Sequence, residues 1–321
     1  MSDQKWNKVG CIFDVSQDWG KLEGYSHCHK PTPLWMGNDV IRVYYGLRDS
    51  NNRTKVSFVD ISAIDFSVLY VHKGIVLDLG ELGTFDDVGA QVTSVVRIDT
   101  NTVYMYYIGW NTSTTVPARN ALGLAVSTDN GYTFERMFQG PILERYKEEA
   151  FHVGASDIKK YDGCWKMWYN SGMGFTVVDG RPEYHVHIKY AESQNGIDWH
   201  RKNIVCIEPN SDTEVVVRPS VIYRKGKYAM FYSYRSIKDF RENKENSYRL
   251  GYAESCDGKT WKRMDEKYPL NVSSIETDWD GQMIAYPYVM EVGNKLVVFY
   301  NGNGFGRTGF GCATLSLEDV D

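Results

Sequence analysis

The sequence predicts an all-β protein, a five-bladed β-propeller, and three observations support this prediction. First, aromatic and β-branched runs alternate with glycine-containing turns, a pattern typical of consecutive antiparallel strands. Second, residues 218–263 hold four such runs in about 45 residues, the size of one propeller blade. Third, this stretch recurs along the chain at a nearly constant period.

The clearest copy begins at Arg218 with an apolar run after a proline. A Lys-Gly turn at 225–226 leads to a run rich in tyrosine and phenylalanine at 228–234. A polar loop is followed by a third run at 248–255 and a short strand around Trp261. The runs have the length of strands, so we expect four antiparallel strands in this copy.

The same unit recurs five times. The residue just before each first-strand step aligns at Lys30, Gln91, Gly154, Arg218 and Tyr286, with spacings of 61, 63, 64 and 68 residues. Aromatic second strands follow at 43–46, 104–107, 166–169, 230–232 and 297–300. An irregular β-sandwich would not produce a fixed period, so we favour a propeller that forms one domain over residues 1–321.

The ends of the chain bear on closure of the ring. The fifth copy holds only three strands of its own before the sequence ends. We expect residues 8–13 to supply its outer strand, because this pairing would close the ring and remove exposed strand edges. Turns at 127–134, 193–199 and 255–261 contain Asp-Asn-Gly, Asn-Gly or Asp-Gly, and we interpret them as structural hairpin turns.

Composition limits the partners. The net charge of −5 predicts no nucleic-acid or anionic-membrane surface, and no stretch approaches the length of a membrane span. Residues 1–5 lack an apolar signal region, and the six cysteines are scattered, so we expect a cytoplasmic protein with free thiols. We expect no cofactor.

Three insertions interrupt the repeat, at 111–119, 173–184 and 237–246. They join second strands to third strands. Long loops on a rigid scaffold often carry function. The charged segment 237–246 also fits an ordinary solvated surface, which we favour for it.

Strand order predicts which polar residues meet. In a propeller the starts of first strands and the ends of second strands lie on one face near the axis, and this face is the candidate site. First-strand starts contribute His27, His29, Lys30, Asp86, Asp87, Gln91, Glu149, His152, Glu214, Arg218, Asp280 and Tyr286. Second-strand ends contribute Arg48, Asp49, Trp110, Asn111, Asn170, Tyr234, Arg235, Asn301 and Asn303.

Carboxylates in this set suit glycoside cleavage, in which one acid protonates the leaving oxygen and another acts as base or nucleophile. Asp87, Glu149 and Glu214 precede their first strands by similar numbers of residues, so we predict that they converge and are catalytic. The alternative is that each is an ion-pair partner for a nearby cation.

Cations in the set suit an anionic substrate group. Lys30, Arg48, Arg218 and Arg235 could bind a phosphate or carboxylate, or could neutralise the acids. His27 and His29 with His152 could form a metal site, but no spacing motif supports one. We therefore predict that these histidines bind sugar hydroxyls and that no metal is present. Trp110 and the tyrosines could stack on a pyranose ring or pack between blades.

With these motifs the chain resembles the five-bladed glycoside hydrolases of families 32, 43, 68 and 130. The resemblance covers nearly the whole sequence through the first-strand steps, the tyrosine-rich second strands and the Ser-x-Asp-Gly turns. Family 43 enzymes carry an Asp just before the first-blade proline, where this sequence has Lys30, and another in blade two, where it has Thr93. Their acid would fall near Arg218, so the usual catalytic triad is absent from its usual places.

Residues 48–59 resemble the strand-end pattern of family 130, many of whose members are phosphorylases. The resemblance therefore implies an enzyme that cleaves or transfers a glycosidic or sugar-phosphate bond. We expect an anionic or nucleotide-linked sugar of bacterial surface-polysaccharide metabolism as the substrate. The alternatives are a non-catalytic sugar-binding propeller and a phosphorylase that uses inorganic phosphate.

Overall fold

The structure is a computed structural model, which describes residues 6–17 and 20–320. Nearly all regular structure in this part of the chain is strand. The helical elements described are the 3-10 turn η1 (Lys244–Asn246) and the short helix α1 (Asn303–Gly306). The prediction of an all-β class is therefore confirmed. Over the described residues, no helix has the length and apolar character that a membrane crossing requires.

Three sheets have four antiparallel strands each. One consists of β10 (Val153–Tyr161), β11 (Cys164–Val178), β12 (Arg181–Ser193) and β13 (His200–Ile207). Another consists of β14 (Glu214–Arg224), β15 (Lys227–Ser236), β16 (Arg249–Ser255) and β17 (Lys262–Arg263). In the third the order is β1 (Asn7–Phe13), β20 (Phe310–Ser316), β19 (Lys295–Asn301) and β18 (Ala285–Val292).

The remaining strands form one eight-stranded sheet. Its first half holds β2 (Ser26–Gly37), β3 (Val40–Arg48), β4 (Thr54–Ser62) and β5 (Val68–Val71). Its second half holds β6 (Gly89–Arg97), β7 (Val103–Asn111), β8 (Arg119–Ser127) and β9 (Glu135–Arg136). A single parallel residue pair, Thr54 with Gly89, joins the halves. Divided there, the sheet gives two more antiparallel four-stranded units.

The first strands of these units contact one another in a closed cycle. β2 contacts β6, β6 contacts β10, β10 contacts β14, β14 contacts β18, and β18 contacts β2. A cycle of innermost strands around an axis defines a propeller, so the predicted architecture is confirmed. The count of five blades stays a prediction, with which this cycle agrees.

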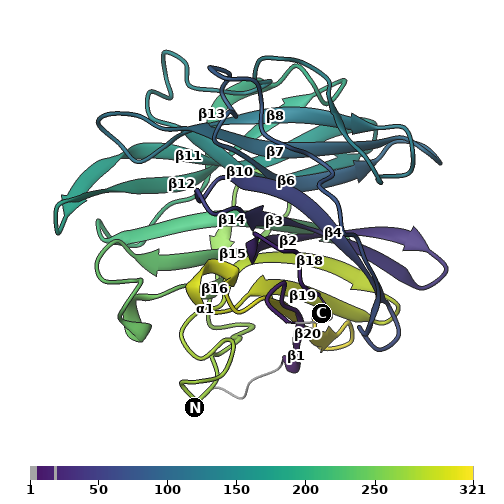
Figure 1. Ribbon diagram of the computed structural model, residues 1–321. Helices are drawn as coiled ribbons and strands as arrows, with labels where there is room; N and C mark the ends of the chain where they lie inside the picture. The colour runs from purple at the N-terminus through teal and green to yellow at the C-terminus, as the bar shows by residue number, and fades with distance from the viewer. Residues whose placement is uncertain (1–5, 18–19, 321) are drawn as a thin grey trace.

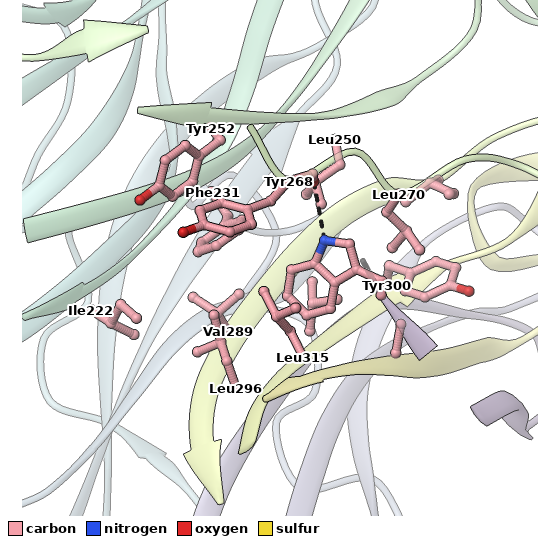
Figure 2. Close-up of a cluster of buried hydrophobic side chains, with 14 of the residues drawn as sticks. Ile222, Phe231, Leu250, Tyr252, Tyr268, Leu270, Val289, Leu296, Tyr300 and Leu315 are labelled. Carbon is pink, nitrogen blue, oxygen red and sulfur yellow. Dashed lines mark hydrogen bonds between the residues drawn. The ribbon is translucent and has the colours of Figure 1, made fainter. Parts of the chain in front are cut away.

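The N-terminal strand lies in the last unit, as expected. β1 pairs antiparallel with β20, and Figure 1 shows this N-terminal strand beside the C-terminal yellow strands. Trp6 just before it belongs to a buried cluster formed with side chains of the last two units, including Phe231, Tyr252 and Leu296 (Figure 2). The Trp6 Nε1–H donates to the Tyr268 carbonyl oxygen at 3.1 Å. Trp6 and β1 are therefore part of the last unit and its core.

The Asp/Asn-Gly turns link neighbouring units. In the first of them Asp129 Oδ1 accepts the backbone N–H of Thr133 at 3.0 Å, which closes the turn. An aromatic side chain of the preceding unit donates to the carbonyl oxygen of each turn glycine: Tyr44 to Gly131 at 2.8 Å, Tyr106 to Gly196 at 3.0 Å and Trp168 to Gly258 at 2.7 Å. The aromatic second strands thus pack and hydrogen-bond between blades.

Candidate functional site

Irregularities in the first strands aim side chains at the axis. The pairing of the first strand with the second is shifted at the aligned position of four units, for example between His29 and Thr32 in the first and between Val217 and Ser220 in the fourth, and just after this position in the second unit. Three aligned residues adopt left-handed backbone conformations, namely Lys30 (φ 54°), Arg218 (φ 59°) and Tyr286 (φ 58°). Bulges with positive φ at non-glycine residues are strained, and such strain is concentrated at functional sites.

Side chains of the neighbouring unit hold these strained residues. The backbone N–H of Lys30 donates to Asn301 Oδ1 at 2.7 Å, and that of Arg218 donates to Asn170 Oδ1 at 3.0 Å. The N–H of Tyr286 donates to Ser233 Oγ at 2.9 Å. Asn170 within β11 and Asn301 at the end of β19, which the sequence predicted to bind substrate, therefore hold the backbone of the neighbouring unit.

Lys30 stands at the middle of a group of cations. Its Nζ lies 3.2 Å from Gln91 Oε1 and 5.1 Å from the centroid of the Tyr286 ring. His29 packs edge to face on the same ring, with 4.9 Å between centroids. Its Nδ1 is hydrogen-bonded to the Gln91 side-chain amide nitrogen. Lys30, Gln91, His29 and Tyr286 thus come from three units, and the structure brings these predicted residues together.

Arg218 lies fully buried at the same place. Its Nη1 donates to the Thr93 carbonyl and hydroxyl and lies 3.3 Å from the Ser156 carbonyl oxygen, and its Nη2 donates to Thr32 Oγ1 at 2.9 Å. These acceptors belong to three other units, so Arg218 joins four units at the axis. Its Nε has no described hydrogen-bond partner. Arg218 is therefore a buried cation beneath the site, and its hydrogen bonds are made to the protein rather than left for a ligand.

We call Lys30, Arg48, Arg218 and Arg307 the axial cationic centre. Burial, with Arg218 and Arg48 adding repulsion, lowers the pKa of Lys30 to about 7. Burial also lowers the pKa of Arg218 to about 10 and that of Arg48 below its usual value. Among the described residues none of these four side chains forms an ion pair with a carboxylate.

The two histidines beside this centre are uncharged near neutral pH. Burial, then the charges of Arg48 and Arg307, lower the pKa of His27 to about 4. Burial and the surrounding cations lower the pKa of His29 well below its usual range. No group of three or more metal-ligating side chains occurs in the described part of the chain. The histidines are therefore suited to hydrogen-bond neutral groups.

The predicted acids lie in a different, repeated arrangement. In the third unit Glu149 accepts hydrogen bonds from Tyr169 at 2.8 Å and from Arg201 at 2.6 Å, and Lys189 Nζ lies at 3.1 Å. Asp86 has the same kind of partners, Tyr107 and Arg136, and Asp280 has Tyr300 and Lys8. We call each such set a carboxylate clasp.

The clasp of the fourth unit has a different set of partners. Glu214 pairs with Arg263 at 2.7 Å, while the Tyr232 hydroxyl donates to Asp265, which also binds Arg263. In the described residues no hydrogen bond joins Glu149 to Glu214. The structure therefore places each of these two predicted catalytic acids in its own clasp, in an ion pair with an arginine of the outer strand.

Asp87 differs from the other predicted acids. Its Oδ2 accepts the Gly83 N–H at 2.9 Å, and its buried Oδ1 has no described partner. Asp49, by contrast, binds the Arg53 side chain and the backbone of its own turn. Asp87 is therefore the predicted catalytic acid that has a buried oxygen without a described hydrogen-bond partner.

The other predicted binding residues are spread over the same face. Trp110 lies over Gly89, where an added Cβ would meet its indole at 1.8 Å, and Asn111 reaches Thr84. Arg235 is buried against Phe240 and Tyr248, and Asn303 binds backbone groups near 278–283. Tyr234 lies at the end of β15. His152 lines a separate cavity described below.

Sequence reasoning missed Arg307. It follows α1 in the loop after the second strand β19, whereas Arg48 ends the second strand β3, and its charge acts on His27 and Arg48. The glycine-rich segment that separates Arg307 from β19 placed it outside the strand-end positions that we considered. The tyrosine and arginine partners of the clasps were also missed, although a tyrosine recurs in every second strand.

Comparisons with known proteins place the chain among carbohydrate-active propellers in fold. No family model matches the sequence. The Mycobacterium tuberculosis proteins "Uncharacterized protein MT1551" and "Uncharacterized protein Rv1502" are each 34% identical over 314 residues, which cover 97% of this chain and 99% of theirs. A "1,2-beta-oligomannan phosphorylase" of Thermoanaerobacter is 37% identical over 200 residues, 62% of this chain and 58% of that protein.

Solved structures share the fold at low sequence identity. A family 130 structure described as targeting beta-1,2 mannosidic linkages superposes with a TM-score of 0.68 at 15% identity, over 98% of this chain and 94% of that one. A thermostable family 43 glycoside hydrolase gives 0.63 at 17% identity, over 92% and 90%. The resemblance to propeller glycoside hydrolases and phosphorylases is confirmed. Likeness at this level of identity concerns the fold alone.

Proposed function

The chain belongs to the family of the uncharacterized Mycobacterium tuberculosis proteins MT1551 and Rv1502, and on that premise we propose that it is a carbohydrate-active enzyme whose substrate carries an anionic group. Membership of this family indicates no particular activity, so the proposal rests on the geometry of the site. The enzyme cleaves or transfers a glycosidic or sugar-phosphate bond of an anionic or nucleotide-linked sugar. It serves bacterial surface-polysaccharide metabolism in the cytoplasm.

The axial cationic centre carries the proposal. Lys30 and Arg48 are largely buried, other cations add to the lowering of both pKa values, and neither side chain has a described carboxylate partner. Desolvating cations costs free energy unless an opposite charge compensates. A phosphate or carboxylate on the ligand would supply that charge and would accept hydrogen bonds from both side chains. The centre is thus suited to an anion rather than to a neutral sugar.

Asp87 is the proposed proton donor. Its free oxygen could protonate the leaving oxygen while the glycosidic C–O bond breaks. When inorganic phosphate is the nucleophile, its oxygen forms the new bond to the anomeric carbon, so one protein acid is sufficient. The name of the oligomannan phosphorylase relative makes mannosides the first substrates to try. Glu149 and Glu214 have positioning roles in this proposal, because ion pairs occupy both.

A turnover screen tests the proposal. Aryl mannosides, β-1,2-mannobiose and nucleotide sugars are incubated with the protein, with and without phosphate, and product release is measured. We expect release that falls about 10²–10⁴-fold in Asp87→Asn, because that substitution removes the proton while keeping the shape. Asp78→Asn, on the same loop, is the matched control and should keep full activity. Full activity in Asp87→Asn would remove Asp87 from the mechanism.

A non-catalytic sugar-binding propeller is the second candidate function. The observation in its favour is that both Glu149 and Glu214 are held in ion pairs, which leaves no pair of free acids among the predicted three. Binding of the same ligands without any product release would favour this function. Phosphate-dependent release would exclude it.

A further inference from the structure

A cavity lies among the insertions, and none of the four residues of the axial cationic centre lines it. It has a volume of about 390 Å³, which lies within the range of small-molecule sites. Its walls come from four separate segments: the loop after β7 with the start of β8, the residue just before β10, the extended β11–β12 hairpin, and the loop after β15. The lining residues used below are Pro117, Asn120, His152, Phe175, Tyr184 and Arg241.

The hairpin wall of this cavity is fixed in place. β11 and β12 stay paired as far as Val178 and Arg181, well beyond the length of neighbouring strands. Glu183 on β12 binds Arg241 of the opposite loop at 2.5 Å, and Arg235 lies 3.8 Å from the same carboxylate. Because Glu183 is buried, this ion pair ties two of the three insertions together. The cavity is therefore preformed.

His152 forms the polar part of the floor. Its side chain is buried and lies between the rings of Phe175, at 5.8 Å, and Tyr184, at 5.3 Å between centroids. No described hydrogen bond reaches either ring nitrogen, and Nδ1 is among the buried atoms without a partner. Burial lowers the pKa of His152 to about 4, so the ring is neutral at pH 7. A neutral imidazole offers one donor and one acceptor.

We propose that this cavity binds a neutral pyranose ring, the uncharged glycosyl part of the substrate. Two aromatic rings, two prolines and the neutral polar side chains of Asn120 and His152 line it. Of its charged lining residues, Arg241 is already paired with Glu183, and Arg181 is exposed to solvent. Phe175 supplies a flat surface for the C–H face of a sugar, and His152 and Asn120 supply hydrogen bonds for hydroxyls. This inference rests on the proposed function, since it assigns the neutral part of the same substrate.

Two larger depressions border the hairpin, of about 780 and 680 Å³. Their walls consist largely of charged loop residues such as Asp179, Glu242 and Lys244, or of the turn at 208–214. No unpartnered buried group from the described residues lines either one. They lack the aromatic and neutral polar walls that a pyranose requires.

The test separates the two sites. Saturation-transfer NMR is recorded with the methyl glycosides of mannose, glucose, galactose and N-acetylglucosamine, and sulfate binding is measured on the same samples. We expect at least one glycoside to bind the wild-type protein, at least fivefold more weakly in Phe175→Ala, and unchanged in Val177→Ala, an exposed position on the same hairpin. Sulfate affinity should stay unchanged in all three proteins.

Each outcome has one reading. Loss of sulfate binding in Phe175→Ala would reveal a damaged fold, in which case Asn120→Ala replaces it as the test variant. If none of the four glycosides binds the wild-type protein, the cavity is not a glycosyl site. The same conclusion follows if Phe175→Ala and Asn120→Ala both leave glycoside binding intact. That result leaves the proposed function standing as long as sulfate binds. Failure of sulfate binding with intact glycoside binding would overturn the proposed function instead.

Discussion

The carboxylate clasps and the axial cationic centre are built from similar ionisable residues in opposite ways. In the second, third and fifth units a buried carboxylate has a tyrosine and a cation as partners, as Glu149 has Tyr169 and Arg201. At the axis Lys30 and Arg48 have no described carboxylate partner. The clasps thus recur in several units, whereas the residue at the aligned first-strand position differs in every unit.

This difference teaches which residues of a repeat protein carry function. A polar arrangement that several units reproduce stabilises those units, because it satisfies the same buried groups each time. Positions that break the repeat, such as Lys30, Gln91 and Gly154 at one aligned step, serve the molecule as a whole. The three acids were predicted from their similar offsets in the repeat; Glu149 and Glu214 lie in clasps, whereas Asp87 does not.

The largest expected effect breaks a clasp. Glu149→Gln should cost about 3–5 kcal/mol of unfolding free energy, because it leaves Lys189 and Arg201 without their charge partner in a buried site. Denaturant unfolding measures the loss. Lys30→Met, which removes an unpaired buried charge, should keep or raise stability. Equal losses in the two variants would refute the contrast between the two regions.

The pH dependence of the Glu149 variant adds a control. Burial alone would raise the pKa of Glu149, but hydrogen bonds from Tyr169 and Arg201 and the charge of Lys189 hold it below its usual value. Its contribution to stability is therefore present above the unfolded pKa and is lost as the pH falls through the folded pKa. The gap between wild type and Glu149→Gln should narrow in acid. Glu148→Gln, an exposed neighbour, should show no gap.

A smaller loss of stability is expected where β1 joins the last unit. Lys8 of β1 binds the buried Asp280 at 2.6 Å, so it forms the cation of the ring-closing clasp. Lys8→Met should cost about 1–3 kcal/mol, since Asp280 keeps its hydrogen bond from Tyr300. Thermal unfolding measures it against Lys147→Met, an exposed lysine outside any clasp. Equal melting temperatures of the two variants would show that the Lys8–Asp280 ion pair does not stabilise the pairing of β1 with the last unit.

Much of the fold could be predicted from the sequence, and less of the site. The period and the aromatic runs predicted the strands, their order and the pairing of the N-terminal strand with the last unit, because blade packing depends on regular spacing. The axial grouping of Lys30, Gln91 and Tyr286 also followed from strand order. The partners of the acids did not follow from strand order: whether Glu149 faces Arg201 or the axis depends on its side-chain direction in the loop before β10, where it bridges Tyr146, and no spacing predicts that direction.

The smallest expected effect sharpens the description of the axial cationic centre. With a pKa of about 7, Lys30 binds fewer protons in the folded state than in the unfolded chain between about pH 7 and 10.5. Stability from this group therefore increases as the pH rises through that window, while its charge is lost. Sulfate does not titrate near neutral pH, so its affinity should follow the protonated fraction of Lys30 and fall about tenfold between pH 6 and 8. Titration calorimetry in wild type and Lys30→Met measures the change. A pH-independent affinity in the wild type, or the same fall in Lys30→Met, would show that Lys30 does not bind the anion.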